Sequence, residues 1–369
     1  MINSSPLLYL VLLALQSIFI CCAGSLSLLA YNKTVISCLK KLSNINLDAL
    51  SQPIDAVMIE DHYKDLLKKT ESLRNIAIHS AAGYNGPWIE NMFIDRFIRK
   101  PLSFFNGFIP LFVQFVDIHV QSILTETDNY TSTLQYLASI LRDDVIYLAI
   151  SQDDQGIGIL QGLKPNILTL SAGGYGHIPI PLIKGDLPYV LPPEHLIGMG
   201  FTGQLRPRLS RYLMLKEMSS LCSKLNIGCR RFGPSLYWRQ EMNITAINLA
   251  PRGFGRTSYK LVEVIQMGRI PAYLYDDIPW IPYEHSNISI TNFGFLGKFH
   301  QFSAMATNIL NLLKHPSKLK EKLEQIRLSR YYYTYKGVLE QIELFLRDPL
   351  GPDGGYLQCP TTLPQHDHR

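Results

Sequence analysis

The sequence lacks the signals that mark nucleic-acid-binding proteins. No zinc-finger spacing, basic helix or RNA-binding aromatic signature occurs in its 369 residues. Charged residues make up only 18% of the chain, and the formal net charge of +5 fits either a basic cleft for an acidic ligand or a scattered surface excess. We therefore expect no nucleic-acid partner.

A dinucleotide fingerprint after the first predicted strand and a metal-ligand spacing among the cysteines are also missing. No Gly-x-Gly-x-x-Gly segment follows the first predicted strand, which disfavours a nicotinamide-dependent enzyme of the Rossmann type. None of the six cysteines has metal spacing. Cys222 and Cys229 lie close together in a predicted helix-to-strand connection, where they are able to form a local disulfide.

What the sequence does have is apolar residues, at 47% of the chain, and a length that accommodates two domains. The segment Pro6–Ala30 carries no charge, and it is longer than the roughly 20 residues that an apolar helix needs to cross a bilayer. It predicts an uncleaved membrane anchor or a signal peptide cut near Cys22. The first basic residue, Lys33, follows this segment, and that bias argues weakly against a cytoplasmic N-terminus.

Both interpretations of the N-terminus send the rest of the chain into the secretory pathway. Four N-glycosylation tripeptides that follow the apolar segment agree with a lumenal location, although Asn243 adjoins a predicted buried strand and not all four need be used. These tripeptides begin at Asn32, Asn129, Asn243 and Asn287.

The stretch 249–283 is predicted to form a strand-helix-strand unit. An apolar run over 244–250 indicates a buried strand, and a turn with two glycines follows over 251–256. Apolar residues recur at helical spacing over 259–267, with Gly268 suited to the C-terminal cap. A second apolar run over 270–275 completes a βαβ unit.

The turn of this unit has the chemistry of an anion site. A helix N-terminus offers backbone N–H groups and a positive dipole end, and Ser258 suits its first turn. Arg252 and Arg256 flank the turn, and guanidinium groups match phosphate oxygens. Glu263, inside the helix, is placed to accept hydrogen bonds from ribose hydroxyls. The alternative is an ordinary βαβ turn with solvated arginines.

The whole string resembles the C-terminal signature of the exostosin family, glycosyltransferase family 47. The matching positions are Pro251, Arg252, Gly253, Gly255, Ser258, Glu263, Gly268, Ile270 and Pro271. Weaker echoes run over 83–335. The resemblance implies a GT-B fold, an α/β architecture of two Rossmann-like domains facing each other across a cleft. It also implies inverting transfer from a nucleotide sugar, a UDP-sugar in particular, to a glycan acceptor, with a Golgi type II membrane anchor.

With the resemblance in place, the sequence divides into five segments. Residues 1–31 form the signal-anchor or signal peptide and 32–74 a stem or first helix. Residues 75–193 form an N-terminal, acceptor-side Rossmann-like domain, and 194–348 a C-terminal domain that binds the nucleotide sugar. Residues 349–369 form a disordered tail.

Candidate catalytic residues lie in the N-terminal domain. A strand and helix resembling the family's opening elements begin near Ile76, and Glu90 on that helix either faces the cleft or caps a surface. Asp153 and Asp154 follow a predicted buried strand over 144–150, at the strand end where ligands of open α/β sheets gather. A carboxylate there is suited to act as base toward the acceptor hydroxyl, although loop-capping aspartates are commoner. The family's His before this Asp is absent, because Gln152 occupies its position.

Two further features concern the donor. Phe201-Thr202-Gly203 resembles the family's Phe-x-Gly, so Gly203 is expected near the donor, with Arg206 or Arg208 near its phosphates; the alternative is two arginines on a solvated loop. No Asp-x-Asp triplet occurs in the chain, and we therefore expect no catalytic metal and no cofactor beyond the nucleotide-sugar donor.

The sequence supports two functions, a glycosyltransferase and a catalytically inactive exostosin-like partner subunit or glycan-binding protein. The missing His favours the second, and intact Arg252, Arg256 and Glu263 favour the first. Donor sugar, acceptor and homo- or hetero-oligomeric state have no readable code here.

Overall fold

The structure is a computed structural model that describes residues 28–29, 31–42, 47–81, 83–204, 209–225, 228–284 and 286–349. Within these ranges, no helix is both long and apolar enough to cross a membrane. The predicted N-terminal apolar segment falls almost wholly outside the described residues, as do Arg206, Arg208 and the predicted tail beyond 349.

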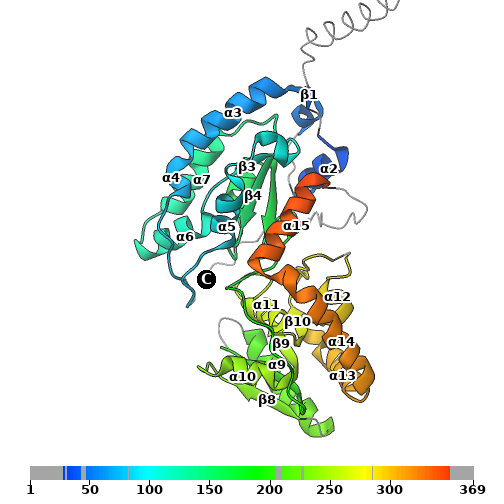
Figure 1. Ribbon diagram of the computed structural model, residues 1–369. Helices are drawn as coiled ribbons and strands as arrows, with labels where there is room; N and C mark the ends of the chain where they lie inside the picture. Colours follow the sequence, from blue (N-terminus) through cyan, green and yellow to red (C-terminus); the bar gives the residue numbers. More distant parts are fainter. Residues whose placement is uncertain are drawn as a thin grey trace, which may run out of the picture.

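The first half of the molecule is built on a four-stranded parallel sheet in the order β3-β4-β5-β6 (Figure 1). Its central strands are fully buried, so they read in the sequence as continuous apolar runs. The strands are β3 (Ile109–Leu111), β4 (Tyr147–Ser151), β5 (Ile167–Ser171) and β6 (Ile178–Pro179).

Helices cover both ends and faces of this sheet. Their apolar residues join one buried core that continues through both halves of the molecule. The helices are α2 (Lys33–Leu42), α3 (Ala56–Lys69), α4 (Glu71–Arg74), α5 (Ile89–Phe97), α6 (Phe115–Leu124), α7 (Asn129–Ile140) and α8 (Gly158–Leu163), with short 3₁₀ turns η1 (Asp48–Ser51) and η2 (Leu102–Phe105). A small antiparallel pair, β1 (Leu28–Leu29) and β2 (Ile54–Asp55), lies beside them.

The second half is a five-stranded parallel sheet in the order β11-β10-β9-β7-β8. Its strands are β7 (Ile197–Thr202), β8 (Cys229–Phe232), β9 (Thr245–Pro251), β10 (Ile270–Tyr275) and β11 (Phe295–Lys298). Its helices are α9 (Leu209–Leu225), α10 (Trp238–Asn243), α11 (Tyr259–Gln266), α12 (Ile290–Phe293), α13 (Phe302–Leu313) and α14 (Pro316–Ser329), with η3 (Phe299–Gln301). Two Rossmann-like halves thus face each other, and the predicted GT-B architecture is confirmed.

The predicted βαβ unit is confirmed almost residue for residue. Strands β9 and β10 are parallel neighbours, and α11 connects them. Ser258 is the N-cap of α11, and Gly268 has the positive φ of 75° expected of a residue that ends a helix. The disulfide between Cys222 and Cys229 also forms, linking α9 to β8.

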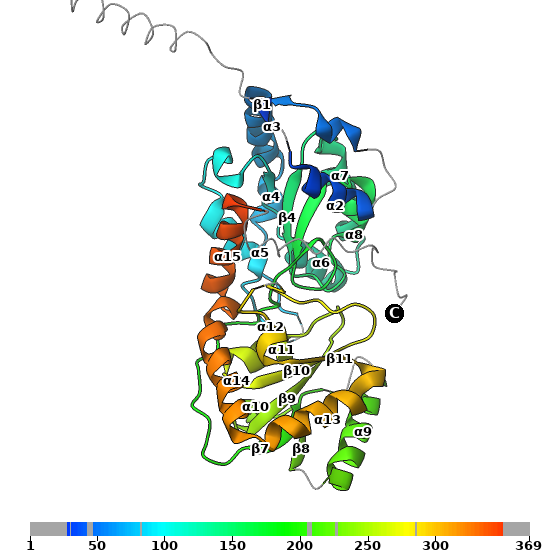
Figure 2. The same ribbon diagram turned by 90° about the vertical axis from the view of Figure 1, so that its right-hand side faces the viewer.

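The last helix crosses back to the first half. Helix α15 (Tyr335–Arg347) follows η4 (Arg330–Tyr333) and continues the line of α14 along one side of both sheets (Figure 2). It packs on α5 and η2, and Phe345 stacks on Phe108. The segment 335–347 therefore belongs by its contacts to the first half, although the sequence places it in the C-terminal domain.

One predicted element is wrong. The stretch from Ile76 to Trp88, expected to open with a strand, shows no strand pairing in its described residues (76–81 and 83–88) beyond a single bridge between Ala81 and Tyr84. Side chains of α6 and its N-cap hold it instead. Gln114 Oε1 accepts a hydrogen bond from Ile76 N, and Asp117 Oδ1 accepts one from His79 N.

Candidate active site

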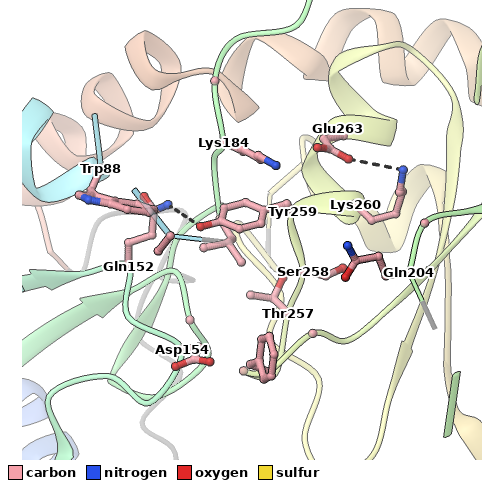
Figure 3. Close-up of a pocket in the computed structure, with 18 of the residues that line it drawn as sticks. Trp88, Gln152, Asp154, Lys184, Gln204, Thr257, Ser258, Tyr259, Lys260 and Glu263 are labelled. Carbon is pink, nitrogen blue, oxygen red and sulfur yellow. Dashed lines mark hydrogen bonds and ion pairs between the residues drawn. The ribbon is translucent and has the colours of Figure 1, made fainter. Parts of the chain in front are cut away.

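A pocket of about 730 Å³ lies between the two halves. Its walls come from the loops after β4 and β5 on one side and from the loops after β7 and β9 on the other. These are the carboxyl ends of parallel strands, where open α/β sheets bind their ligands. Figure 3 shows residues of both halves converging on it.

The two halves touch directly beside the pocket. Arg256 N donates to Gly173 O at 2.9 Å, and Trp280 Nε1 donates to Ser171 O at 2.8 Å. A Cβ on Gly255 would lie 2.0 Å from Gly173 O, so glycine is required for this approach of two backbones. The loops after β5 and β9 therefore form one closely packed seam under the pocket.

The N-terminus of α11 opens into the pocket. Thr257, Ser258, Tyr259 and Lys260 all line it (Figure 3). Ser258 is only 6% exposed, and its Oγ has no hydrogen-bond partner among the described residues, although it is the N-cap. A buried hydroxyl without a partner costs free energy, and an anion bound at the helix N-terminus would satisfy it.

Charged side chains follow along the same helix. Glu263 lines the pocket and pairs with Lys260, whose Nζ lies 3.5 Å from Glu263 Oε2 (Figure 3). Burial lowers the pKa of Lys260, and its ammonium sits over the Trp238 ring at 5.2 Å. Arg211 is a further cation of this wall; its guanidinium donates to Gln204 O at 3.0 Å and to Arg252 O at 2.8 Å.

Arg252 and Arg256, whose guanidinium groups the sequence suggested for phosphate oxygens, do not reach the pocket. Both are buried, at 4% and 3% exposure, and neither lines the pocket. Arg252 Nε donates to Gly255 O at 2.8 Å, and its Nη1 lies 3.3 Å from Asp276 Oδ2 and 3.5 Å from Asp277 Oδ1.

Arg256 is enclosed in the same way. Its Nη2 lies 2.9 Å from Asp277 Oδ2, its Nη1 donates to Gly174 O at 3.1 Å, and its guanidinium stacks over the Tyr175 ring at 4.4 Å. These contacts use guanidinium donors that a phosphate would otherwise take. The two arginines therefore shape the turn and the seam between the halves.

The other residues predicted to bind the donor line the pocket, as far as they fall within the described ranges. Gly203, Gly253, Gly255, Ser258 and Glu263 line it. The predicted donor contact of Arg206 lies outside the described residues.

Of the predicted catalytic carboxylates, Asp153 and Asp154 line the pocket and Glu90 does not. The expectation that Glu90 faces the cleft is wrong, because its side chain is 2% exposed and Oε1 accepts from Gln152 N at 2.8 Å. Burial raises the pKa of Glu90 to about 8, so the carboxyl group is protonated at neutral pH.

Sequence reasoning missed His119. This residue lies on α6, 34 positions before Asp153, and its Nδ1 contacts Asp153 Oδ2. Both side chains line the pocket. The available signal was the spacing of Val116, His119, Val120 and Ile123, which puts one face of α6 on the pocket wall.

Two other polar residues have structural contacts. Gln152 accepts from Ile89 N at 2.9 Å and donates to Ile183 O at 2.9 Å and to Tyr259 Oη at 3.4 Å (Figure 3). It therefore links α5 to α11. His177 is 1% exposed and accepts from Thr169 N, and burial lowers its pKa to about 3.

The pocket thus has the N-terminus of α11 with Lys260 on one wall, and two aspartates and an imidazole on the other. No group of three potential metal ligands gathers among the described residues.

Comparisons with known proteins give structural likeness only. No protein-family model and no curated protein matches the chain. Among solved structures, it is similar to a TarM structure (TM-score 0.36, 14% identity, 59% of this chain and 46% of that one). It is also similar to the pneumococcal O-GlcNAc transferase GtfA in complex with UDP and GlcNAc (TM-score 0.35, 13% identity, 61% and 48%). The matched region spans less than half the length of these structures.

Proposed function

We propose that the chain is an inverting, exostosin-like glycosyltransferase that moves a sugar from a UDP-sugar to a glycan acceptor. The observation that carries this proposal is the placement of α11 opposite Asp153 and Asp154 in one pocket. An anion site and a candidate base on facing walls suit a reaction in which a hydroxyl attacks as a diphosphate leaves.

The donor binds along the C-terminal half in this proposal. Its diphosphate lies at the N-terminus of α11, where backbone N–H groups, the helix dipole and Ser258 Oγ receive it. Lys260 supplies a cation one residue into the helix, and Glu263 accepts from the ribose hydroxyls. These groups stabilise the charge that develops on the leaving diphosphate, and no divalent metal is required.

The acceptor binds against the N-terminal half. A base on that wall removes the proton of the acceptor hydroxyl as its oxygen bonds to the anomeric carbon. The bond from that carbon to the diphosphate oxygen breaks, and the electron pair leaves with UDP. Because the base and the leaving group lie on opposite walls, a single displacement with inversion fits the arrangement.

We further propose that the enzyme works in the lumen of the secretory pathway, anchored as a type II membrane protein. The uncharged segment before residue 31 and the glycosylation tripeptides support this location.

A panel of nucleotide sugars, scored by the UDP that is released with glycan acceptors, tests the proposed reaction. We expect one UDP-sugar to react, and Ser258→Ala to raise its KM while leaving the melting temperature unchanged or higher, since the hydroxyl has no partner to lose. UDP binding without transfer to any glycan would favour the inactive partner subunit. A chain that neither binds UDP nor releases it is not a glycosyltransferase of this kind.

A further inference from the structure

We infer that the base is the imidazole of His119 and that Asp153 is a positioning residue that holds this ring. This inference rests on the proposed function and names the proton acceptor of that reaction. Neither the family resemblance nor the residues around the β4 loop point to a residue on α6.

The side chains of His119 and Asp153 differ in their exposure. The Asp153 side chain is 5% exposed and that of His119 is 21% exposed, so the imidazole is the more accessible of these two pocket-lining groups. Asp153 uses Oδ2 for His119 and Oδ1 to accept from Gln155 N at 2.8 Å. The ring is therefore more accessible to an acceptor sugar than Asp153, whose two carboxylate oxygens already have partners.

A second element fixes the plane of the ring. Tyr130 on α7 stacks on His119 with centroids 4.6 Å apart and planes 22° from parallel. Tyr130 is itself held, because its hydroxyl donates to Gly156 O at 3.1 Å. The imidazole is thus oriented by a carboxylate at one edge and by an aromatic face, from two different elements.

The Asp153 contact also selects the tautomer. With the proton of Nδ1 donated to the carboxylate, Nε2 carries the lone pair that takes the proton of the acceptor hydroxyl. The acceptor oxygen then bonds to the anomeric carbon as UDP leaves with the electron pair of the broken bond. Asp153 stabilises the imidazolium that forms, and the proton afterwards passes to water.

Titratable groups lie beside the ring. Asp153, from the loop after β4, and Tyr130, from α7, contact the ring directly, and Asp154 lines the same pocket. Ionised Asp153 favours the protonated ring most directly, because it touches Nδ1.

The test measures transfer kinetics between pH 5 and 9 and UDP affinity by calorimetry for His119→Gln and Asp153→Asn. We expect His119→Gln to lose about 100-fold or more in kcat, the range for a general base, with unchanged UDP affinity. The fall of kcat/KM at acidic pH, where the imidazole is protonated, should vanish in this variant. Asp153→Asn should move that fall to lower pH, because the carboxylate no longer favours the charged ring.

His62→Gln is the matched control. His62 on α3 hydrogen-bonds Tyr147 Oη at 2.7 Å and lies outside the pocket lining, so its loss should leave kcat and the pH profile unchanged. Added imidazole should partly restore transfer by His119→Ala, which a merely structural histidine would not allow. A His119→Gln enzyme whose kcat is normal and whose kcat/KM still falls at acidic pH overturns the inference. UDP binding and transfer by the native chain would keep the proposed function intact in that case.

Discussion

At the residue scale, the surroundings of Arg252 and Arg256 decide between binding and folding roles. Carbonyl oxygens and the carboxylates of Asp276 and Asp277 surround both guanidinium groups. The charged guanidinium group of Arg256 therefore contributes to the contact between the two halves.

Arg256→Ala should destabilise the protein. Removing one partner of a buried ion pair costs about 3–5 kcal/mol, and the half-exposed Asp277 places the expected loss near the lower end, about 3 kcal/mol. Urea unfolding of the two proteins measures the difference. An Arg256→Ala protein with native stability but weak UDP binding would restore the phosphate-binding role.

Glu263→Gln should raise the donor KM about tenfold or more, in line with the 1.5–3 kcal/mol of a lost charged hydrogen bond. Stability should stay within about 1 kcal/mol, because the residue sits at the pocket wall. Glu343→Gln, which loses ion pairs to Arg96 and Arg347 outside the pocket lining, is the control for loss of a glutamate charge. Equal KM values in both variants would make Glu263 a purely structural partner of Lys260.

Glu90 gives the molecule a pH-dependent stability. Burial raises its pKa from 4.5 to about 8, so the unfolded chain releases this proton at lower pH than the folded one. Its contribution is complete below pH 4.5 and is lost as pH rises through 8. At 1.36 kcal/mol per pKa unit, the loss between pH 5 and 8 is about 3 kcal/mol.

Glu90→Gln should remove that slope, because the amide does not ionise. Denaturant melts at pH 5 and pH 8 should show stability falling more steeply for the native chain than for the variant. Parallel slopes would mean that Glu90 is ionised in the folded protein.

At the scale of elements, the glycine seam under the pocket is the sharpest constraint. A Cβ on Gly255 would meet Gly173 O at 2.0 Å and Asp154 O at 3.0 Å, both backbone atoms that cannot swing away.

Gly255→Ala should therefore destabilise the protein by about 1–3 kcal/mol and weaken UDP binding, because the loops after β5 and β9 must part. Gly162→Ala on α8 is the matched control. A Cβ there meets nothing within 4 Å, so alanine should be neutral or stabilising by up to about 1 kcal/mol. Equal effects of the two substitutions would contradict the close contact between the halves.

The elements that the sequence predicts well are those set by local pattern. The βαβ unit around α11 follows from apolar runs, two glycines and a cap, all within 35 residues, and its bounds agree with the structure. The side-chain directions in the turn were not predictable, because Asp276, Asp277 and Gly174 surround the arginines from other segments.

Longer-range contacts account for the other differences. His119 meets Asp153 across 34 residues, and the segment 76–88 is held by Gln114 and Asp117 rather than by a strand partner. Val116, His119 and Ile123 have helical spacing, but no local pattern says which surface that face of α6 contacts. Only the tertiary structure could therefore identify His119 as the ring beside Asp153.

At the scale of the whole molecule, two parallel sheets present their carboxyl ends to one pocket. Helix α15 returns to the first half and ties the two halves together: Tyr335 N donates to Asp186, and Tyr335 Oη donates to Pro87 O. The pocket is therefore assembled by the whole chain rather than by either half.

A structure of the protein with bound UDP tests the central claim most directly. We predict diphosphate oxygens within about 3.2 Å of Ser258 Oγ and of backbone N–H groups in the first turn of α11, with the ribose beside Glu263. The same map should show Arg252 and Arg256 still paired with Asp276 and Asp277. A diphosphate bound on the N-terminal half would contradict the proposed donor site. So would a diphosphate held by those two arginines after they leave their carboxylates.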